Sequence, residues 1–387
     1  MSDEVVLGLI GCGGNMGGHV KRGYKTLWEA GLRDFRIAAT CDIDKSKAEK
    51  LAVAAEEFQG TRPTVYSSVD EMLEKESDIT ACDISIVHNE HHKVAVPCFQ
   101  AGKHVTIEKP LGITCRAAQA IINAANEAGK LLQTAENYRR RPDDRAVQWA
   151  VKSGRIGDPR MIFWLQIRER MWYWGWREEK DLAGGGWTMD GGVHYADLFR
   201  YVIGPVKTMY ALSKQHCPTR YRNREEMTDP VEVTVEDTTI ATFEFENGVS
   251  GQWTSTNVAP GNSIGANTVY GSEGSVSWRG GLKTRTQELT ADQLVEEYMK
   301  NLDDEEREKW FPSGVTESLA TELWEFMQAI RGKAKIETDG VEGLKALAIC
   351  MAIYESSVLG QPVEVAKIEN CEIETYQQPL NEAGGLL

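Results

Sequence analysis

The sequence has no hydrophobic run that approaches the roughly 20 residues a membrane-spanning helix needs. Its first four residues, Met-Ser-Asp-Glu, lack the basic start of a secretory signal. These two absences argue against a membrane-spanning or exported chain. We therefore expect a cytoplasmic protein.

Positive charge and paired cysteines are also scarce. The chain has 43 Lys and Arg against 58 Asp and Glu, giving a formal net charge of −15. Such a chain repels phosphate backbones and anionic lipid, so neither nucleic acid nor a membrane surface is an expected partner. The eight cysteines are scattered without a C-x-x-C pair, which predicts reduced thiols rather than a disulfide framework.

The length of 387 residues suffices for two or three domains with substantial cores. In the first part of the chain, short apolar runs alternate with helix-like segments. This alternation predicts an α/β Rossmann domain with a doubly wound parallel sheet. The expected strands are 5–10, 35–41, 64–66, 83–87, 105–107 and 131–134, and the expected helices end near residue 30 or span 45–58, 69–75, 95–101 and 116–128.

The composition changes near residue 136. Longer strands of alternating hydrophobic character then predict an α+β domain with a large, mainly antiparallel open sheet. These strands are 161–167, 206–212, 238–245, 249–256 and 267–271, and helices are expected at 316–331 and 341–359. We predict a dinucleotide-binding domain over 1–135 and a substrate-binding and oligomerisation domain over 136–387. The late helices are expected to pack back on the first domain.

A glycine-rich turn, Gly11-Cys12-Gly13-Gly14-Asn15-Met16-Gly17, follows the first expected strand. Glycines let the backbone approach a pyrophosphate, whose charge then meets the N-terminus of the following helix. Gly11 and Gly13 fit the spacing G-x-G-x-x-G, but the next glycine of the pattern, Gly17, comes one residue late. Taken alone, the turn is also compatible with a tight connection that binds no ligand.

The second expected strand ends at Asp42. A carboxylate there can accept both ribose hydroxyls of an adenosine. It repels the extra phosphate of NADP by about 4 kcal/mol per charge pair at an effective dielectric near 20, so NAD is favoured. The alternative is that Asp42 and the neighbouring Asp44 cap the helix 45–58.

A lysine, Lys109, comes just after the short apolar run 105–107, and Pro110 prevents the strand from continuing because proline has no amide donor. Ligands of open α/β sheets bind beyond the carboxyl ends of the strands, so this ammonium can meet a ligand held by the glycine turn. The alternative is a surface lysine in a turn.

Three histidines, His88, His91 and His92, follow the preceding strand in the same way. No carboxylate or cysteine stands at a recognised zinc spacing, so no metal is expected. The histidines are expected to line the nicotinamide or substrate side, or His92 to pack against the next helix.

In the second domain, Asp190 and His194 follow a Gly-Gly-Gly run. On one helix, residues four apart share a face, so the carboxylate can orient the imidazole. An imidazole with a pKa near ~6.5 suits the removal of a hydroxyl proton at neutral pH. A buried, hydrogen-bonded histidine at a domain interface is the alternative.

The segment 168–177 concentrates arginines and tryptophans, including Arg168, Trp172 and Trp176. Aromatic rings bind the faces of sugars, and arginines bind anionic or hydroxyl-rich groups in bidentate fashion. Packing in the core or at a subunit interface explains such a segment equally well.

Together these motifs resemble the glucose–fructose oxidoreductase / inositol dehydrogenase / rhizopine-catabolism (Gfo/Idh/MocA) family. The resemblance covers almost the whole chain. It rests on the glycine turn, A-G-K-H-V-x-x-E-K-P at 101–110, G-R-I-G at 154–157, G-G-G-x(3)-D-x(3)-H at 184–194 and the late helix around 344–354.

The resemblance implies that Lys109, Asp190 and His194 are catalytic and that the Lys109–Pro110 bond is cis. The implied dinucleotide contacts are Gly11, Gly13, Gly14, Asn15, Met16, Gly17, Asp42, His88, Asn89, Glu108 and Lys109. We predict substrate contacts at His91, Tyr138, Arg168, Trp172, Trp176, Trp187, Asp190 and His194. Two departures stand out: the family's Thr-Pro-Asn-like turn is replaced here by Val87-His88-Asn89-Glu90, and the segment 168–177 is not a general family feature.

The main hypothesis is an NAD-dependent oxidation of a secondary alcohol on a sugar, sugar derivative or cyclitol. The first alternative is a glycosidase that uses NAD for transient oxidation at C3, elimination and re-reduction. A non-catalytic regulator that senses dinucleotide is ranked last, because the lysine, aspartate and histidine are all present. The resemblance also implies a homodimer or homotetramer built on the open face of the second sheet.

Overall fold

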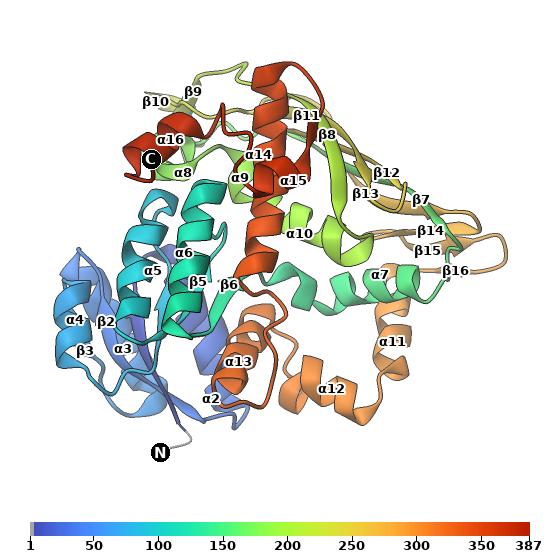
Figure 1. Ribbon diagram of the computed structural model, residues 1–387. Helices are drawn as coiled ribbons and strands as arrows, with labels where there is room; N and C mark the ends of the chain where they lie inside the picture. Colours follow the sequence, from blue (N-terminus) through green and yellow to red (C-terminus); the bar gives the residue numbers. More distant parts are fainter. Residues whose placement is uncertain (1–3) are drawn as a thin grey trace. The chain divides into compact units, whose positions relative to one another are not determined.

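The computed structural model describes residues 4–387, which fall into two compact units (Figure 1). The first unit runs to Gly112 and also contains Ala117–Arg141 and Asp303–Gly343. The second unit contains Ile113–Arg116, Pro142–Leu302 and Leu344–Leu387. Residues 1–3, which contributed to the prediction that no secretory signal is present, lie outside the described part of the chain.

The first unit is built on a six-stranded sheet in the order β3-β2-β1-β4-β5-β6. Every pair of neighbouring strands is parallel, which confirms the predicted doubly wound sheet. Burial of β1 along its whole length agrees with a sheet covered on both faces. The strands are β1 Val5–Ile10, β2 Phe35–Cys41, β3 Thr64–Tyr66, β4 Ala81–Ile84, β5 His104–Glu108 and β6 Leu132–Ala135.

Several element boundaries differ from the prediction, among them those on either side of the histidine cluster. The fourth strand begins at Ala81 and ends at Ile84, not at 83 and 87. The Ser85 carbonyl that comes next lies so close to Gly11 that a Cβ there would be 2.2 Å away, and a 3₁₀ turn at His88–Glu90 follows. Helix α5 begins at His91 rather than at residue 95.

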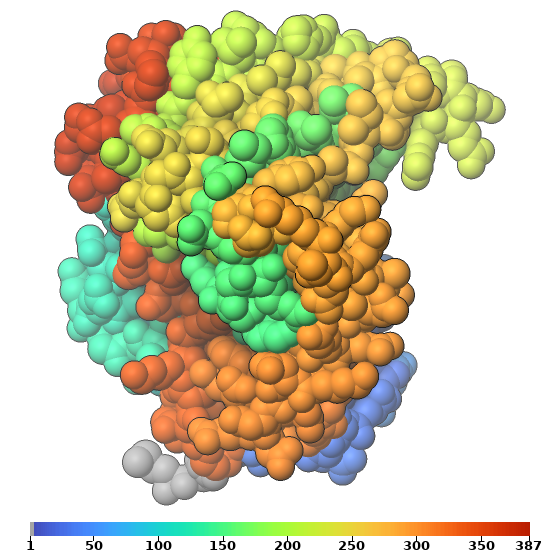
Figure 2. Space-filling model, turned by 90° about the vertical axis from the view of Figure 1, so that its right-hand side faces the viewer, coloured from blue at the N-terminus to red at the C-terminus, as the bar shows by residue number. Residues whose placement is uncertain are grey.

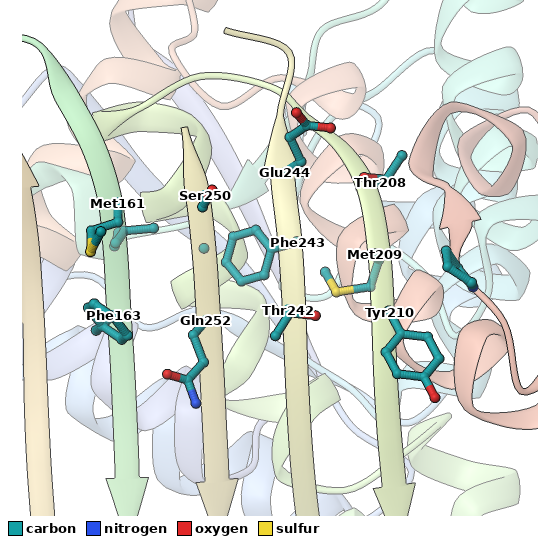
Figure 3. Close-up of a pocket in the computed structure, with 13 residues that line it drawn as sticks. Met161, Phe163, Thr208, Met209, Tyr210, Thr242, Phe243, Glu244, Ser250 and Gln252 are labelled. Carbon is teal, nitrogen blue, oxygen red and sulfur yellow. The ribbon is translucent and has the colours of Figure 1, made fainter. Parts of the chain in front are cut away.

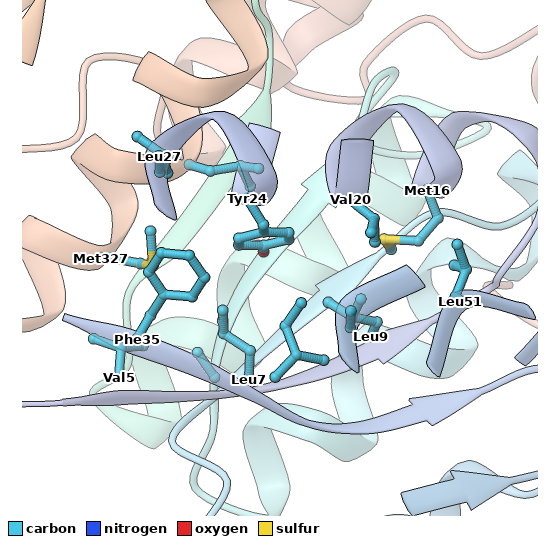
Figure 4. Packing of buried hydrophobic residues seen from close by; sticks show 14 of the residues in the cluster. Val5, Leu7, Leu9, Met16, Val20, Tyr24, Leu27, Phe35, Leu51 and Met327 are labelled. Atoms are coloured by element: carbon cyan, nitrogen blue, oxygen red, sulfur yellow. The ribbon is translucent and has the colours of Figure 1, made fainter. Parts of the chain in front are cut away.

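The helix after the glycine turn has three parts: α1 Gly14–Gly18, a π-helical turn at His19–Tyr24 and α2 Lys25–Glu29. It packs with β1, β2 and the later helix α13 around a buried apolar cluster that includes Leu7, Leu9, Phe35 and Met327 (Figure 4). The remaining helices of this unit are α3 Lys45–Gln59, α4 Val69–Lys75, α5 His91–Gln100, α6 Cys115–Ala128, of which the first two residues fall in the second unit, α12 Asp304–Trp310 and α13 Ser318–Ile330.

The second unit contains a nine-stranded sheet in the order β16-β15-β14-β13-β7-β12-β11-β8-β17. All of its pairs are antiparallel except β7 with β12, so the predicted mainly antiparallel sheet is confirmed. The strands are β7 Pro159–Ile167, β8 Val206–Lys214, β11 Thr238–Phe245, β12 Ser250–Thr256, β13 Ile264–Gly271, β14 Gly274–Ser277, β15 Gly281–Thr284, β16 Glu288–Leu289 and β17 Val363–Glu364.

One face of this sheet carries helices, and a separate hairpin stands beside it. Helix α10 Gly192–Val202 packs so closely on the sheet that a Cβ at Gly192 would lie 2.4 Å from the ring of Trp253 on β12. The hairpin of β9 Thr219–Asn223 and β10 Thr228–Glu232, yellow-green in Figure 2, projects from the unit. Further helices are α7 Pro142–Lys152, α8 Lys180–Ala183, α9 Trp187–Asp190, α11 Ala291–Asn301, α14 Gly340–Leu359, which starts in the first unit, α15 Val365–Glu369 and α16 Gln378–Ala383.

The opposite face of the same sheet is open. Along β11, buried and exposed residues alternate, as expected for a strand that is covered on one side only. Figure 3 shows Met161, Phe163 and Tyr210 gathered on this face with polar neighbours. Leu212 and Ile240 are opposite each other in the pairing of β8 with β11 and are 46% and 47% exposed.

Within residues 4–387, no helix is both long and apolar enough to cross a membrane. All eight cysteines are free thiols.

Two glutamates on α13 have contrasting surroundings. Glu322 is fully buried, and neither of its carboxylate oxygens has a hydrogen-bond partner among the described residues. Burial raises the pKa of Glu322 well above its usual value, although the charge of Arg140 acts in the opposite direction. Glu325, by contrast, accepts hydrogen bonds from Arg140 Nη2 at 2.8 Å and from Glu337 N–H at 3.0 Å.

We predict that Glu322→Gln stabilises the protein at neutral and alkaline pH. The folded chain keeps the Glu322 proton above pH ~4.3, where the unfolded chain releases it, so wild-type stability falls as pH rises. The fall is at most about 1.4 kcal/mol per pH unit, and the glutamine variant should lack it. Urea unfolding from pH 5 to pH 9 measures the difference.

Glu325→Gln is the matched control on the same helix. It should lose about 3–5 kcal/mol at pH 7, because it removes a charge partner of buried Arg140. A Glu322→Gln variant whose stability follows wild type at every pH would contradict the prediction.

Candidate active site

The glycine turn after β1 combines one tightly packed glycine with three open ones. Gly11 has φ +83°, and a Cβ at this position would lie 2.2 Å from the carbonyl oxygen of Ser85. The Cβ positions of Gly13, Gly14 and Gly17 have no atom within 4 Å. Since α1 begins at Gly14, open backbone adjoins a helix N-terminus, which fits the pyrophosphate of a dinucleotide. Asn15 and Met16 lie in the first turn of this helix, and Met16 is buried.

The carboxylate of Asp42, just after β2, is tied to the glycine turn. Its Oδ2 accepts the Cys12 N–H at 2.7 Å, and its Oδ1 accepts the Asp44 N–H at 2.8 Å. Each oxygen keeps a lone pair that a ribose hydroxyl can use. The N-cap of α3 is Asp44, which accepts the Ser46 N–H, so the capping alternative holds for Asp44 and not for Asp42.

A buried charged cluster beneath the glycine turn was not expected from the sequence. His19 Nδ1 lies 2.9 Å from Asp83 Oδ2, and His19 Nε2 lies 3.0 Å from Glu108 Oε1. The hydroxyl of Tyr24 donates to the same Asp83 oxygen at 2.9 Å. Burial alone would lower the pKa of His19, but the charges and hydrogen bonds of the two carboxylates outweigh it and raise the pKa well above the usual value. The sequence signal that could have revealed this cluster is Asp83, an acidic residue within an apolar strand.

Lys109 directly follows β5, and its peptide bond to Pro110 is cis, as the resemblance implied. Glu108 acts on both sides of this position. Its Oε1 binds His19, and its Oε2 accepts the Lys109 N–H at 3.2 Å. The backbone that carries the lysine is thereby connected to the helix of the glycine turn.

The histidine cluster after β4 lies within a 3₁₀ turn and the start of α5. The His91 ring nitrogens face two carbonyl oxygens, that of Leu111 at 3.4 Å and that of Ile86 at 3.3 Å, and burial lowers the pKa of His91 to about 4. His91 thus faces main chain, and the ring of His88 meets it edge-on at 5.6 Å. Asn89 Oδ1 has no hydrogen-bond partner within the described chain. No group of three metal-binding side chains occurs between residues 4 and 387.

In the second unit, Asp190 and His194 lie on successive helices, so the single predicted helix is interrupted. Asp190 ends α9, and His194 lies in the first turn of α10 after Gly191. The chain needs glycine at this junction, because a Cβ at Gly191 would lie 2.5 Å from the Trp187 ring. Both side chains are buried.

Two charged groups hold the segment that carries Asp190. Arg177 Nε donates to Asp190 Oδ1 at 3.1 Å. Glu236 accepts the N–H groups of Gly186 at 2.6 Å and Thr188 at 3.0 Å, one on each side of the start of α9. Burial raises the pKa of Glu236, and these hydrogen bonds counteract that rise.

The segment 168–177 surrounds the start of α9 with alternating cations and rings. The rings of Trp174 and Trp187 are stacked at 5.9 Å, and Arg170 lies over both at 4.5 and 5.6 Å. Arg177 lies over Trp176 at 4.5 Å, and Trp172 packs against Trp174 at 5.9 Å. The remaining predicted substrate contact, Tyr138, belongs to the first unit, where Arg141 covers its ring at 3.7 Å.

The structure therefore places the predicted site residues in two groups. The first group follows the carboxyl ends of four neighbouring strands: Asp42 follows β2, the glycine turn follows β1, the turn at His88–Glu90 comes after β4, and Lys109 follows β5. Asp190, His194 and the Trp/Arg segment form the second group. The first arrangement is that of a dinucleotide-binding sheet, and the class of protein is a nicotinamide-dependent oxidoreductase.

Comparisons with known proteins give the family. Residues 5–136 match "Oxidoreductase family, NAD-binding Rossmann fold", and residues 149–365 match "Oxidoreductase family, C-terminal alpha/beta domain". The chain belongs to the Gfo/Idh/MocA oxidoreductase family.

Several of its relatives are dehydrogenases or reductases of sugars and cyclitols. The chain is 28% identical to 1,5-anhydro-D-fructose reductase of Ensifer adhaerens, over 77% of this chain and 83% of that protein. It is 31% identical to D-glucoside 3-dehydrogenase of Escherichia coli K12, over 56% of this chain and 61% of that protein. The chain is accordingly an oxidoreductase of CH–OH groups that uses a nicotinamide dinucleotide.

Solved structures share the fold. The WlbA dehydrogenase from Bordetella pertussis, in complex with NADH and UDP-GlcNAcA, has a TM-score of 0.71 at 25% identity and covers 93% of this chain and 97% of its own. Levoglucosan dehydrogenase, in complex with NADH and L-sorbose, has a TM-score of 0.74 at 22% identity and covers 94% of this chain and all of its own, 100%.

We predict that alanine substitutions at two glycines of the turn affect different properties, stability at Gly11 and NADH binding at Gly13. Gly11→Ala should cost about 2–6 kcal/mol, because it combines a left-handed backbone with a clash against the Ser85 carbonyl. Gly13→Ala has φ −78° and free space, so its stability should stay within about 0.5 kcal/mol of wild type. Its methyl group should nevertheless weaken NADH binding at least tenfold by obstructing the pyrophosphate. Thermal unfolding and NADH fluorescence titration separate the two effects. Wild-type NADH affinity in Gly13→Ala would contradict the proposal that the glycine turn binds the pyrophosphate.

Proposed function

We propose that the protein is an NAD-dependent dehydrogenase that oxidises a secondary alcohol of a sugar, sugar derivative or cyclitol. The observation that carries the proposal is the row of strand ends, where an open glycine turn, a carboxylate and Lys109 follow neighbouring strands. The sugar and cyclitol dehydrogenases among the relatives support the substrate class.

The residues present fit a nicotinamide dinucleotide. The open glycines would hold its pyrophosphate, Asp42 its adenosine ribose, and His88, Asn89 and Glu108 the region of the nicotinamide. Accepting a hydride is the chemistry that the dinucleotide supplies when bound. NAD is proposed over NADP because the carboxylate of Asp42 would lie beside the extra phosphate.

The protein's own groups would handle the proton and the charge on oxygen. His194 accepts the hydroxyl proton, and Asp190, itself held by Arg177, orients the imidazole. The ammonium of Lys109 would stabilise negative charge that develops on a substrate oxygen. The rings of Trp172, Trp176, Trp187 and Tyr138 offer faces for a sugar. His91 contributes by fixing the loops at Ile86 and Leu111.

We predict that His194→Ala lowers kcat by about 10²–10⁴-fold while NADH affinity stays at the wild-type value, because only proton transfer is lost. The assay follows NADH formation with levoglucosan, methyl glucosides and myo-inositol. His216→Ala, which changes an exposed histidine of the same unit, is the control and should behave as wild type.

Two outcomes would contradict the proposal. Normal turnover of His194→Ala would remove the histidine from the mechanism. Release of aglycone from aryl glycosides without net NADH formation would identify the glycosidase reaction instead.

We also propose that copies of the chain associate through the open face of the nine-stranded sheet. Contiguous exposed apolar side chains of this kind mark association surfaces. Ile240→Glu places a charge opposite Leu212 and should reduce the molar mass measured by light scattering to that of a smaller species. Ile43→Glu alters an isolated exposed residue of the first unit and is the control. Equal molar masses for wild type and Ile240→Glu would place any interface elsewhere.

A further inference from the structure

Arg168 is fixed in place but has no acidic partner. It follows β7, where its N–H donates to the Thr256 carbonyl at 3.1 Å. Its guanidinium lies over the ring of Trp187 at 4.6 Å, and its Nε donates to Asn257 Oδ1 at 2.9 Å. Both contacts orient the guanidinium, yet no residue from 4 to 387 accepts a hydrogen bond from its two terminal amino groups.

The neighbouring arginines are all matched to carboxylates. Arg177 pairs with Asp190 at 3.1 Å. Arg170 and Arg220 share Glu178 at 3.3 and 3.4 Å, and Arg220 is fully buried and also donates to two main-chain carbonyls. Arg168 pairs with no carboxylate in the part of the chain that the structure describes.

The positive charges of these arginines also act on one another. The pKa of Arg170 is lowered to about 10, chiefly by burial and in smaller part by the charges of Arg168 and Arg220, while the charge of Glu178 acts in the opposite direction. This occurs in a chain whose formal net charge is −15. Further donors of this cluster, Trp187 Nε1, Arg170 Nε and Arg220 Nε, are buried without a hydrogen-bond partner among the described residues.

We propose that Arg168 binds the carboxylate of an acidic carbohydrate, such as a uronic or aldonic acid, and so determines the substrate class. The inference rests on the proposed dehydrogenase function. The two free amino groups of one guanidinium match the two oxygens of a carboxylate. A phosphomonoester would call for a second free cation, and the segment 168–177 contains no lysine.

The position of Arg168 suits substrate recognition. Trp187, on which its guanidinium lies, is the first residue of α9, and Asp190 is the last. A carboxylate held by Arg168 would therefore be anchored at the start of the helix that ends at the proposed catalytic pair. The tryptophan faces beside it would contact the sugar ring.

The test compares matched acidic and neutral probes. Initial rates of NADH formation are measured with D-glucuronate and D-glucose, D-galacturonate and D-galactose, and D-gluconate and D-glucitol. Wild type should prefer the acid in at least one pair, and Arg168→Met should reduce that preference about 10- to 100-fold, as expected for a hydrogen bond between charged groups. Arg222→Met is the control, because Arg222 also lies near an aromatic ring of this segment, Tyr173 at 5.5 Å, but is exposed and paired with Asp229.

A binding readout keeps the inference separate from the proposed reaction. Quenching of tryptophan fluorescence by the same probes, with NADH present, requires no turnover. Acid-selective quenching that is lost in Arg168→Met but kept in Arg222→Met supports the inference even if no probe yields NADH, an outcome that would count against the dehydrogenase proposal alone. Arg168→Lys keeps the charge but not the planar fork and should recover only part of the affinity.

Three results would overturn the inference: acids that bind no better than their neutral partners in all three pairs, equal acid affinity in wild type and Arg168→Met, or a stronger preference for D-glucose 6-phosphate than for any carboxylate. Circular dichroism of each variant establishes that the fold is retained.

Discussion

The dinucleotide-binding part of the first unit depends on the two contacts made by the carboxylate of Glu108. One of its oxygens binds His19 in the helix after the glycine turn, and the other binds the N–H of Lys109. His19 also binds Asp83 on β4. The helix after the glycine turn, β4 and the end of β5 therefore share one buried charge cluster. Buried charges are costly unless they are paired, and removing one partner is more costly still. The cluster therefore fixes the position of the Lys109 backbone relative to the glycine turn that would bind the cofactor.

The second unit uses the same device. Buried Glu236 binds the backbone on both sides of the start of α9, and Arg177 binds the side chain at its end. In both units a carboxylate binds main-chain N–H groups next to a side chain that we propose to be catalytic. Catalysis by positioned acids and bases requires this arrangement, because a displacement of about 1 Å can cost about 10²-fold in rate. The fold thus supplies rigidity where the proposed chemistry needs it.

Local pattern was sufficient to predict both sheets and the place of Lys109, because strand periodicity and Pro110 act over a few residues. It was insufficient where distant residues decide. The close approach of Gly11 to the Ser85 carbonyl, for example, joins the ends of two different strands. His19 was missed because its partners are 64 and 89 positions away. The isolation of Arg168 likewise becomes visible only when the partners of Arg170, Arg177 and Arg220 are known.

The irregular glycine spacing also has a structural reason. Met16 stands where G-x-G-x-x-G places its last glycine, and its side chain is buried in the core beside the sheet (Figure 4). A π-helical turn follows at once, and such a turn accommodates one extra residue. Residues five apart lie on nearly the same side of a π-helical turn, so His19 and Tyr24 both reach Asp83. Met16 therefore packs in the core, and the π-helical turn that begins at His19 brings His19 and Tyr24 to the charge cluster that also contains Glu108.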